Sequence, residues 1–198
     1  RDFYRRYVRP IVSKGAKAFV IISDALRYET AIELQETISR STKGMAVLES
    51  CQAEFPSITK FGMAALLPGE EIAVTENMEV LRAGMPTRST ADRQRVLMAA
   101  EPNSAAVQYQ ELLAMKRAER RALTTGQCVV YIYHNTIDAI GDKTATESKV
   151  FAACHDAVQE LTNLLRIVVN DLQGTDILIT ADHGFLYTYE PLSESDKV

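Results

Sequence analysis

An uninterrupted apolar run that ends in an acid constrains the fold of this chain more than any other feature. Residues 18–22 read AFVII without polar alternation, and Ser23 and Asp24 follow them. Such a run predicts a short strand, over residues 18–23, that is buried on both faces as in a parallel sheet. Asp24 then lies at the carboxyl end of an interior strand, which is where open α/β sheets bind ligands. A carboxylate buried there requires a cation, a proton or several hydrogen-bond donors.

Asp24 also has a purely structural interpretation. Ser23 or Asp24 could be the N-cap of a helix that the sequence predicts over residues 25–40. The stretch by itself does not distinguish this capping role from a ligand-binding role.

Two further apolar strands, predicted over residues 129–133 and 176–180, also carry polar groups at their ends. The groups are Asp138 and Asp142 after the first strand, and Asp182 and His183 after the second. Because the carboxyl ends of parallel strands meet at one edge of a sheet, we expect these acids and Asp24 to gather in a small volume. Like charges so close together are stable when a metal ion neutralises them. Taken singly, the first group could be an ordinary Asp-rich turn, but the three strand ends together favour metal ligation.

A candidate nucleophile lies in residues 54–69, EFPSITKFGMAALLPG. Ser57 and Thr59 are residue types that cap helices, and the compact apolar helix predicted after them ends at Pro68-Gly69. A hydroxyl in the first turn of a helix lies near unpaired N–H groups and the positive end of the dipole, which favours a phosphoryl group and would ease ionisation of Thr59. The alternative is that Ser57 or Thr59 only caps the helix.

The remaining pattern predicts one α/β domain with a mainly parallel sheet flanked by helices. We expect this domain to span residues 1–198 and, because the basic and aromatic start resembles the tail of a preceding helix, to be a fragment of a longer protein. The further elements predicted are short strands at 45–49 and 72–74, a surface insertion over 70–105, and helices over 104–124 and 146–172.

Charge and composition exclude several classes of protein. The 22 basic and 26 acidic side chains give a net charge of -4, which argues against a surface that contacts nucleic acid or anionic lipid throughout. A local basic patch, such as residues 116–121, remains compatible with DNA. No apolar run approaches the roughly 20 residues of a membrane span, and no signal-peptide core is present. We therefore expect a cytoplasmic protein whose three widely spaced cysteines are reduced.

Four segments, taken in order, resemble the alkaline phosphatase superfamily and, more narrowly, the PglZ family of the BREX phage-exclusion systems of bacteria. They are SDALRYE at 23–29, PSITKFGMAALLPG at 56–69, IDAIGD at 137–142 and TADHGF at 180–185. The resemblance implies an alkaline-phosphatase-like core in which Thr59 is the nucleophile. It implies that Asp24, Thr59, Asp182 and His183 bind the metal that activates this nucleophile, and that Asp138 and Asp142 bind a second one.

The sequence departs from the family pattern at the second metal. The superfamily's DxxGH motif ends here in Asp142 instead of histidine, and a later histidine ligand does not occur before Val198. The resemblance implies one or two divalent ions with zinc as the first choice, whereas an all-oxygen pair favours magnesium or manganese.

The activity that the resemblance implies is that of a metal-dependent phosphatase or phosphodiesterase in a bacterial phage-defence system. Thr59 would attack phosphorus and form a phosphothreonine, which water would then hydrolyse. The implied partners are a phosphate-ester substrate and other proteins of the BREX complex, including a DNA methyltransferase. Two alternatives remain open: a non-catalytic, metal-stabilised interaction domain of the defence complex, and a nuclease acting on DNA.

Overall fold

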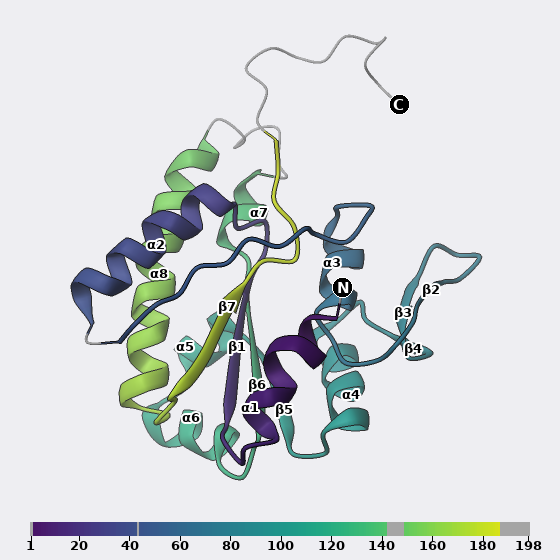
Figure 1. Cartoon of the computed structure of the whole chain (residues 1–198), viewed down its shortest axis with the longest axis horizontal. Coiled ribbons are helices and arrows are strands. Elements are labelled where there is room, and N and C mark those ends of the chain that lie inside the picture. Colours follow the sequence, from purple (N-terminus) through teal and green to yellow (C-terminus); the bar gives the residue numbers. More distant parts are fainter. Residues whose placement is uncertain (1, 43, 142–148, 187–198) are drawn as a thin grey trace, which may run out of the picture.

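A four-stranded parallel sheet forms the centre of the protein (Figure 1). The computed structural model describes residues 2–42, 44–141 and 149–186. The strands are β1 (Ala18–Ser23), β5 (Ser104–Gln108), β6 (Val129–His134) and β7 (Asp176–Thr180), in the order β5-β6-β1-β7. Every neighbouring pair is parallel. The predicted α/β class with a mainly parallel sheet is therefore confirmed.

Helices cover both faces of this sheet, because alternate residues of each strand point to opposite sides. On one face, Phe19 and Ile21 of β1 share a core with α2 (Tyr28–Ser41) and α8 (Val150–Asn170). That core also includes residues of α5 (Tyr109–Ala114) and α7 (Thr136–Gly141).

On the other face, Val20 and Ile22 share a second core with α3 (Thr59–Ala65) and α4 (Thr90–Ala100). Val8 of η1 (Tyr4–Val8) belongs to this second core, and α1 (Arg9–Val12) follows η1. β1 is entirely buried between the two layers, as its unbroken apolar sequence predicts.

One part of residues 70–105 lies beside the main sheet, and another part is packed into the second core. A small antiparallel sheet, β2 (Ile72–Val74), β3 (Val80–Arg82) and β4 (Met85–Pro86), lies to the side of the main sheet (Figure 1). The strand predicted at 72–74 is thus present. Val96 and Leu97 of α4 are buried in the second core. The assignment of a single domain with an insertion remains a prediction.

Three predicted elements differ from the structure, each because tertiary contacts override local pattern. Residues 45–49 are not a strand, since they pair with no described strand. Residues 104–124, predicted to be one helix, form three elements. The first is the strand β5, because Ser104–Gln108 pairs in register with β6. The helices α5 and α6 (Arg117–Thr124) follow it. The helix predicted to begin at residue 25 begins at Tyr28.

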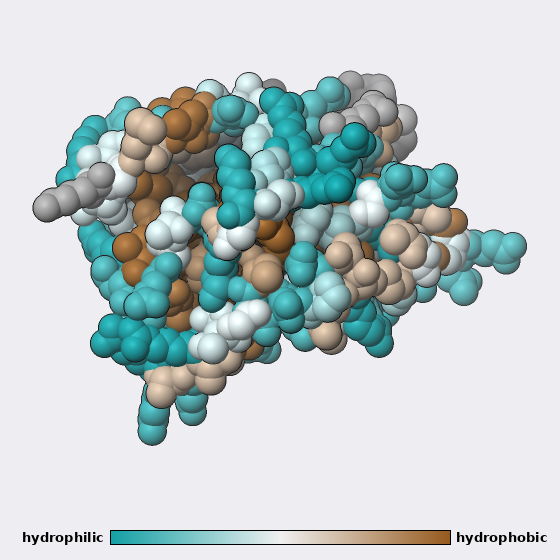
Figure 2. Space-filling view, turned by 60° about the horizontal axis from the view of Figure 1, so that its bottom comes forward, coloured by the Kyte–Doolittle hydropathy of each residue, from teal (hydrophilic) through white to brown (hydrophobic). Residues whose placement is uncertain are grey.

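An apolar hollow lies on the face covered by α2 and α8, at the left of the view in Figure 2. It has a volume of about 700 Å³ and lies between α2, residues 44–48, the end of α8 and β7. Met45 and Val47 beside it are among the most exposed apolar side chains of the described chain. None of the described helices has both the length and the apolar character needed to cross a bilayer.

Candidate active site

The carboxyl ends of three strands bring the predicted acids to one edge of the sheet. Asp24 follows β1 directly, and Asp182 with His183 follows β7. Asp138 lies in α7, the short helix after β6, and not in the loop or turn that the sequence indicated. β1 lies between β6 and β7, so the three ends are adjacent.

Thr59, the first residue of α3, faces this edge from the other side of the cluster. Its Oγ1 lies 3.0 Å from Nε2 of His183 and 3.5 Å from Oδ1 of Asp24. Nε2 of His183 lies 3.4 Å from Asp24 Oδ1 and also 3.4 Å from Asp182 Oδ2. Three of the predicted site residues therefore converge on one imidazole nitrogen of the fourth.

The second ring nitrogen of His183 determines what Nε2 can do. Nδ1 lies 2.8 Å from the carbonyl oxygen of Gly184. A carbonyl only accepts, so Nδ1 carries the proton in the neutral ring and Nε2 keeps its lone pair. That lone pair is directed at Thr59 and the two carboxylates, and it is available to a metal ion or to the threonine proton.

Asp182 is buried with one oxygen satisfied and one not. Its Oδ1 accepts a hydrogen bond of 3.2 Å from the backbone N–H of Ala25. Ala25 has a φ of 60°, a left-handed conformation that a non-glycine residue adopts only at a cost. Oδ2 of Asp182 has no hydrogen-bond partner among the described residues. A buried, unpartnered carboxylate oxygen beside an imidazole lone pair fits a cation.

The electrostatics of the acids support the same interpretation. Burial, together with the neighbouring charges of Asp182 and Asp138, raises the pKa of Asp24 to about 8. Burial likewise raises the pKa of Asp182, although the adjacent His183 opposes the shift. Arg93 of α4 opposes the rise in the pKa of Asp24. Without a counter-ion, these carboxylates hold protons at a pH where exposed acids have lost them.

The ligand set fits a divalent metal. One ligand atom each from Asp24, Asp138 and His183 lie within 4.8 Å of one another, which is close enough to share an ion. Asp182 adds the unpartnered oxygen described above. Asp142, the other predicted ligand, lies outside the described residues.

Neither Asp24 nor Thr59 is the N-cap of the helix that follows it. The N-cap of α2 is Arg27, three residues after Asp24. The N-cap of α3 is Ile58, and no side chain makes a capping hydrogen bond there. The Thr59 hydroxyl is therefore directed at the acidic cluster and does not close its own helix, while Ser57 lies outside the helix.

A glycine in the middle of α3 allows this helix to approach the strand end. A Cβ added to Gly62 would lie 2.4 Å from the carbonyl oxygen of Asp182. Only glycine permits such contact, so Gly62 sets how closely Thr59 approaches His183. Sequence reasoning missed this residue, although a glycine inside an apolar helix often marks a close packing contact.

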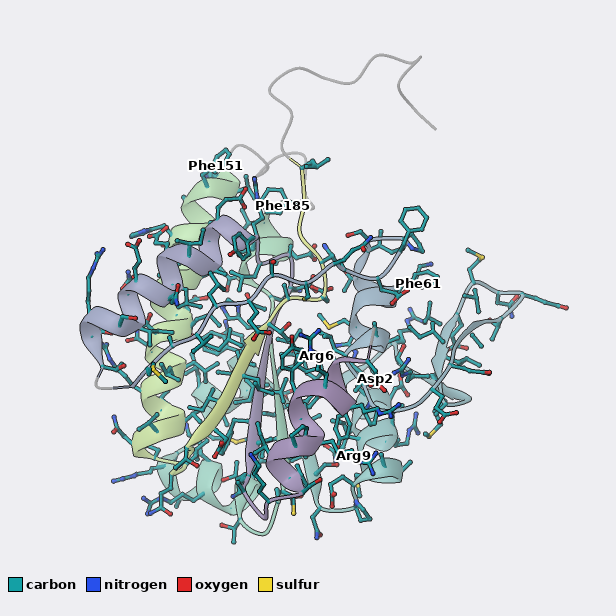
Figure 3. All side chains as sticks on the ribbon, viewed as in Figure 1. Asp2, Arg6, Arg9, Phe61, Phe151 and Phe185 are labelled. Atoms are coloured by element: carbon teal, nitrogen blue, oxygen red, sulfur yellow. The ribbon has the colours of Figure 1, made fainter. Side chains whose placement is uncertain are left out.

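Two further features border the cluster. Figure 3 shows Phe185 beyond the carboxyl ends of β1 and β7, and the guanidinium of Arg27 lies 5.0 Å from the centre of its ring. A cavity of about 140 Å³ lies on the other side, lined among others by Arg6, Gly62 and Asp182. Arg27 is paired with Glu29, and Asp2 and Glu54 also line the cavity, so the surroundings of the cluster carry charges of both signs.

Comparison with known proteins shows which family the chain resembles. A family model described as "BREX system PglZ alkaline phosphatase-like domain" matches residues 3–198. The alkaline phosphatase-like protein PglZ of Bacillus cereus (strain H3081.97) is 43% identical over 196 residues, which cover 99% of this chain and 23% of that protein. The alkaline phosphatase-like protein BrxZ of Escherichia coli O9:H4 (strain HS) is 42% identical over 201 residues, or 100% of this chain and 23% of that protein. The chain spans about a quarter of the length of these relatives.

Proposed function

This chain belongs to the PglZ family of BREX alkaline phosphatase-like domains, and we propose that it is the metal-dependent phosphoester-hydrolysing domain of a longer phage-defence protein. Thr59 is the proposed nucleophile. Asp24, Thr59, Asp182 and His183 are the proposed ligands of one divalent ion, and Asp138, with Asp142, extends the ligand set toward a second.

The observation that carries this proposal is the position of the Thr59 hydroxyl. Its Oγ1 lies within 3.5 Å of both a histidine lone pair and a buried carboxylate oxygen, on residues that come from three separate elements. Threonine hydroxyls become nucleophiles in such surroundings, because an adjacent base or metal removes the proton.

The bound ion would supply Lewis acidity, which lowers the pKa of a neighbouring hydroxyl and offsets the charge of phosphate oxygens. The side chains of the protein would supply the charge, the proton acceptor and the position of the nucleophile. Asp24 and Asp182 would give up the protons that burial keeps on them and carry negative charge toward the ion. His183 presents Nε2 because Gly184 fixes its Nδ1 proton. The close approach that Gly62 allows between α3 and the strand end supports the proposed role of Thr59 as the attacking group.

The reaction then has two displacements. The Oγ1 of Thr59 attacks phosphorus, and the bond from phosphorus to the ester oxygen breaks, so that an alcohol leaves and phosphothreonine forms. A water molecule next attacks phosphorus, the bond from phosphorus to Oγ1 breaks, and Thr59 recovers its proton. The proposed substrate class is a phosphomonoester or phosphodiester.

The wider role follows from the family and stays a proposal for the whole protein. The two relatives are named as alkaline phosphatase-like proteins, and the family model places the domain in BREX systems. We propose that the longer protein acts in a complex with other BREX proteins, including a DNA methyltransferase. Zinc is the proposed ion, with magnesium and manganese as alternatives because most candidate ligand atoms are oxygens.

The test is a pair of Thr59 variants in the full-length protein. Turnover of p-nitrophenyl phosphate and of bis-p-nitrophenyl phosphate is measured with and without added Zn²⁺, Mn²⁺ or Mg²⁺, and metal content is determined by elemental analysis. Thr59→Ala should lower turnover by about 10³-fold or more while the protein retains metal. Thr59→Ser should keep part of the activity because it retains a hydroxyl. Undiminished turnover by Thr59→Ala would refute the assignment.

A further inference from the structure

A polar chain lies directly behind the acidic cluster, buried at two of its side chains and half-buried at the other two, and the catalytic roles proposed above do not use it. Its members are Ser23, His134, Thr136 and Glu160, which come from β1, β6, α7 and α8. Ser23 Oγ lies 2.9 Å from Nδ1 of His134, and Nε2 of His134 lies 2.8 Å from Oε2 of Glu160. The Thr136 hydroxyl donates to the same Glu160 oxygen.

The hydrogen-bond directions in this chain have one consistent solution. The Glu160 carboxylate only accepts, so Nε2 of His134 carries its proton and Thr136 donates its own. Nδ1 of a neutral His134 is then an acceptor, and the Ser23 hydroxyl donates to it. Burial lowers the pKa of His134, which agrees with a neutral ring. The ring of Tyr109 packs against His134 edge-on, with ring centres 4.9 Å apart.

The chain touches the site at two points. Ser23 directly precedes Asp24, and the backbone N–H of Asp24 donates to the carbonyl oxygen of His134 at 2.8 Å. Thr136 begins α7, and Asp138 lies in the same first turn of that helix. Asp24 is therefore held to His134 by a main-chain bond and through the side chain of its neighbour Ser23. Asp138 is held to α8 through Thr136, which donates to Glu160 from the start of the same short helix.

Core stability alone does not account for these polar groups. Ser23 and His134 are fully or almost fully buried, and apolar side chains of similar volume fill such a space without the cost of desolvation. A satisfied polar chain instead imposes directions and distances that apolar packing does not.

We propose that His134 and Glu160 are positioning residues that hold Asp24 and Asp138 at the separation a shared divalent ion requires. The inference rests on the metal site of the proposed function. Its prediction concerns metal affinity, because ligands that must first be brought together bind an ion more weakly than ligands already in place.

The test compares Glu160 variants with a matched control. Glu33 of α2 and His155 of α8 form a second Glu–His pair, which is exposed and 3.4 Å apart; His155 is on the same helix as Glu160. Zn²⁺ and Mn²⁺ affinities of the full-length protein are measured by isothermal titration calorimetry for the wild type, Glu160→Ala, Glu160→Gln and Glu33→Ala. Folding is checked by thermal unfolding.

Glu160→Ala should raise the dissociation constant about tenfold or more. Glu160→Gln should stay near the wild-type value, since its amide oxygen still accepts from His134 and Thr136, and Glu33→Ala should leave affinity unchanged. A folded Glu160→Ala protein with wild-type affinity would overturn the inference.

If Glu160→Ala does not fold, the affinity of Ser23→Ala is measured in the same way. Weaker binding by Ser23→Ala would support the inference, and unchanged affinity would overturn it. A wild-type protein that binds no divalent ion would instead refute the proposed function.

Discussion

Thr59 Oγ1 and His183 Nε2 lie 3.0 Å apart, although 124 residues separate them in the chain. The contact joins the first turn of α3 to the loop after β7 and brings a hydroxyl to an unprotonated imidazole nitrogen. Such a hydroxyl can become covalently modified during turnover.

We therefore predict that the phosphoryl group can be trapped on Thr59. Acid quenching of the full-length protein during turnover should leave a phosphorylated peptide that contains residue 59, because phosphothreonine is stable in acid. Thr59→Ser should move the modification to serine, and Thr59→Ala should abolish it. Detection of the phosphoryl group on any other side chain, with Thr59 unmodified, would contradict the assignment.

The raised pKa of Asp24 predicts how the metal-free protein responds to pH. Its folded value is about 8 against an ordinary value of 3.8, so the folded state binds the extra proton between these values. Stability should therefore fall as pH rises from about 4 to about 8, with no further loss from this group above that range. Thermal unfolding in the presence of a chelator measures the effect.

Two controls separate Asp24 from the other acids. Asp24→Asn should flatten the decline, since the amide does not ionise. Added divalent ion should restore stability at pH 8 in the wild type, because the ion replaces the proton. An equal decline in the wild type and Asp24→Asn would show that other groups cause it.

Gly62 should be intolerant of any side chain. In Gly62→Ala the new Cβ would meet the Asp182 carbonyl oxygen at 2.4 Å, so α3 or the strand end must shift. Displacing a reacting group by about 1 Å can lower turnover about 100-fold, and the overpacking costs about 1–3 kcal/mol of stability. Gly44→Ala is the matched control, because its Cβ would make an ordinary contact with Thr42 at 3.5 Å. Equal kinetic constants for both variants would exclude this role.

Asp138 and Asp182 should contribute differently to metal binding. Asp182→Asn should weaken binding of the ion next to Thr59, because the unpartnered Oδ2 is replaced by a neutral amide atom. Asp138→Asn should reduce the number of ions bound if two are present, and the affinity if one ion is shared with Asp24 and His183. Elemental analysis and calorimetry distinguish the two cases. Unchanged metal content and affinity in both variants would contradict the proposed ligand set.

The interior strands and their terminal acids were predictable from local pattern. Residues 18–23 and 176–180 are strands as predicted. β1 is buried throughout, as its unbroken apolar sequence predicts, whereas β7 lies at the edge of the sheet and is only half-buried. Thr59 was singled out as a hydroxyl in the first turn of a predicted helix and His183 by its place after a strand, and the family resemblance implied a role for both. The geometry that joins them could not be read locally, since it depends on the close approach of Gly62 to Asp182.

Other local predictions were wrong because contacts elsewhere decided the outcome. The pattern at 104–108 gave no indication of a strand, and this segment became β5 because β6 offered an edge to pair with. Residues 45–49 have a strand-like sequence, yet they find no partner among the described strands.

The amino-acid sequence by itself determined which acids follow the strands, since each apolar run ends shortly before an acid and the carboxyl ends of parallel strands share one edge. The tertiary structure alone decided that Thr59 faces His183 and does not cap a helix, and that Glu160, 26 residues from His134, closes the polar chain behind Asp24. The physical reason is that periodicity and capping act over a few residues, whereas distances between side chains on different elements depend on how helices pack against the sheet.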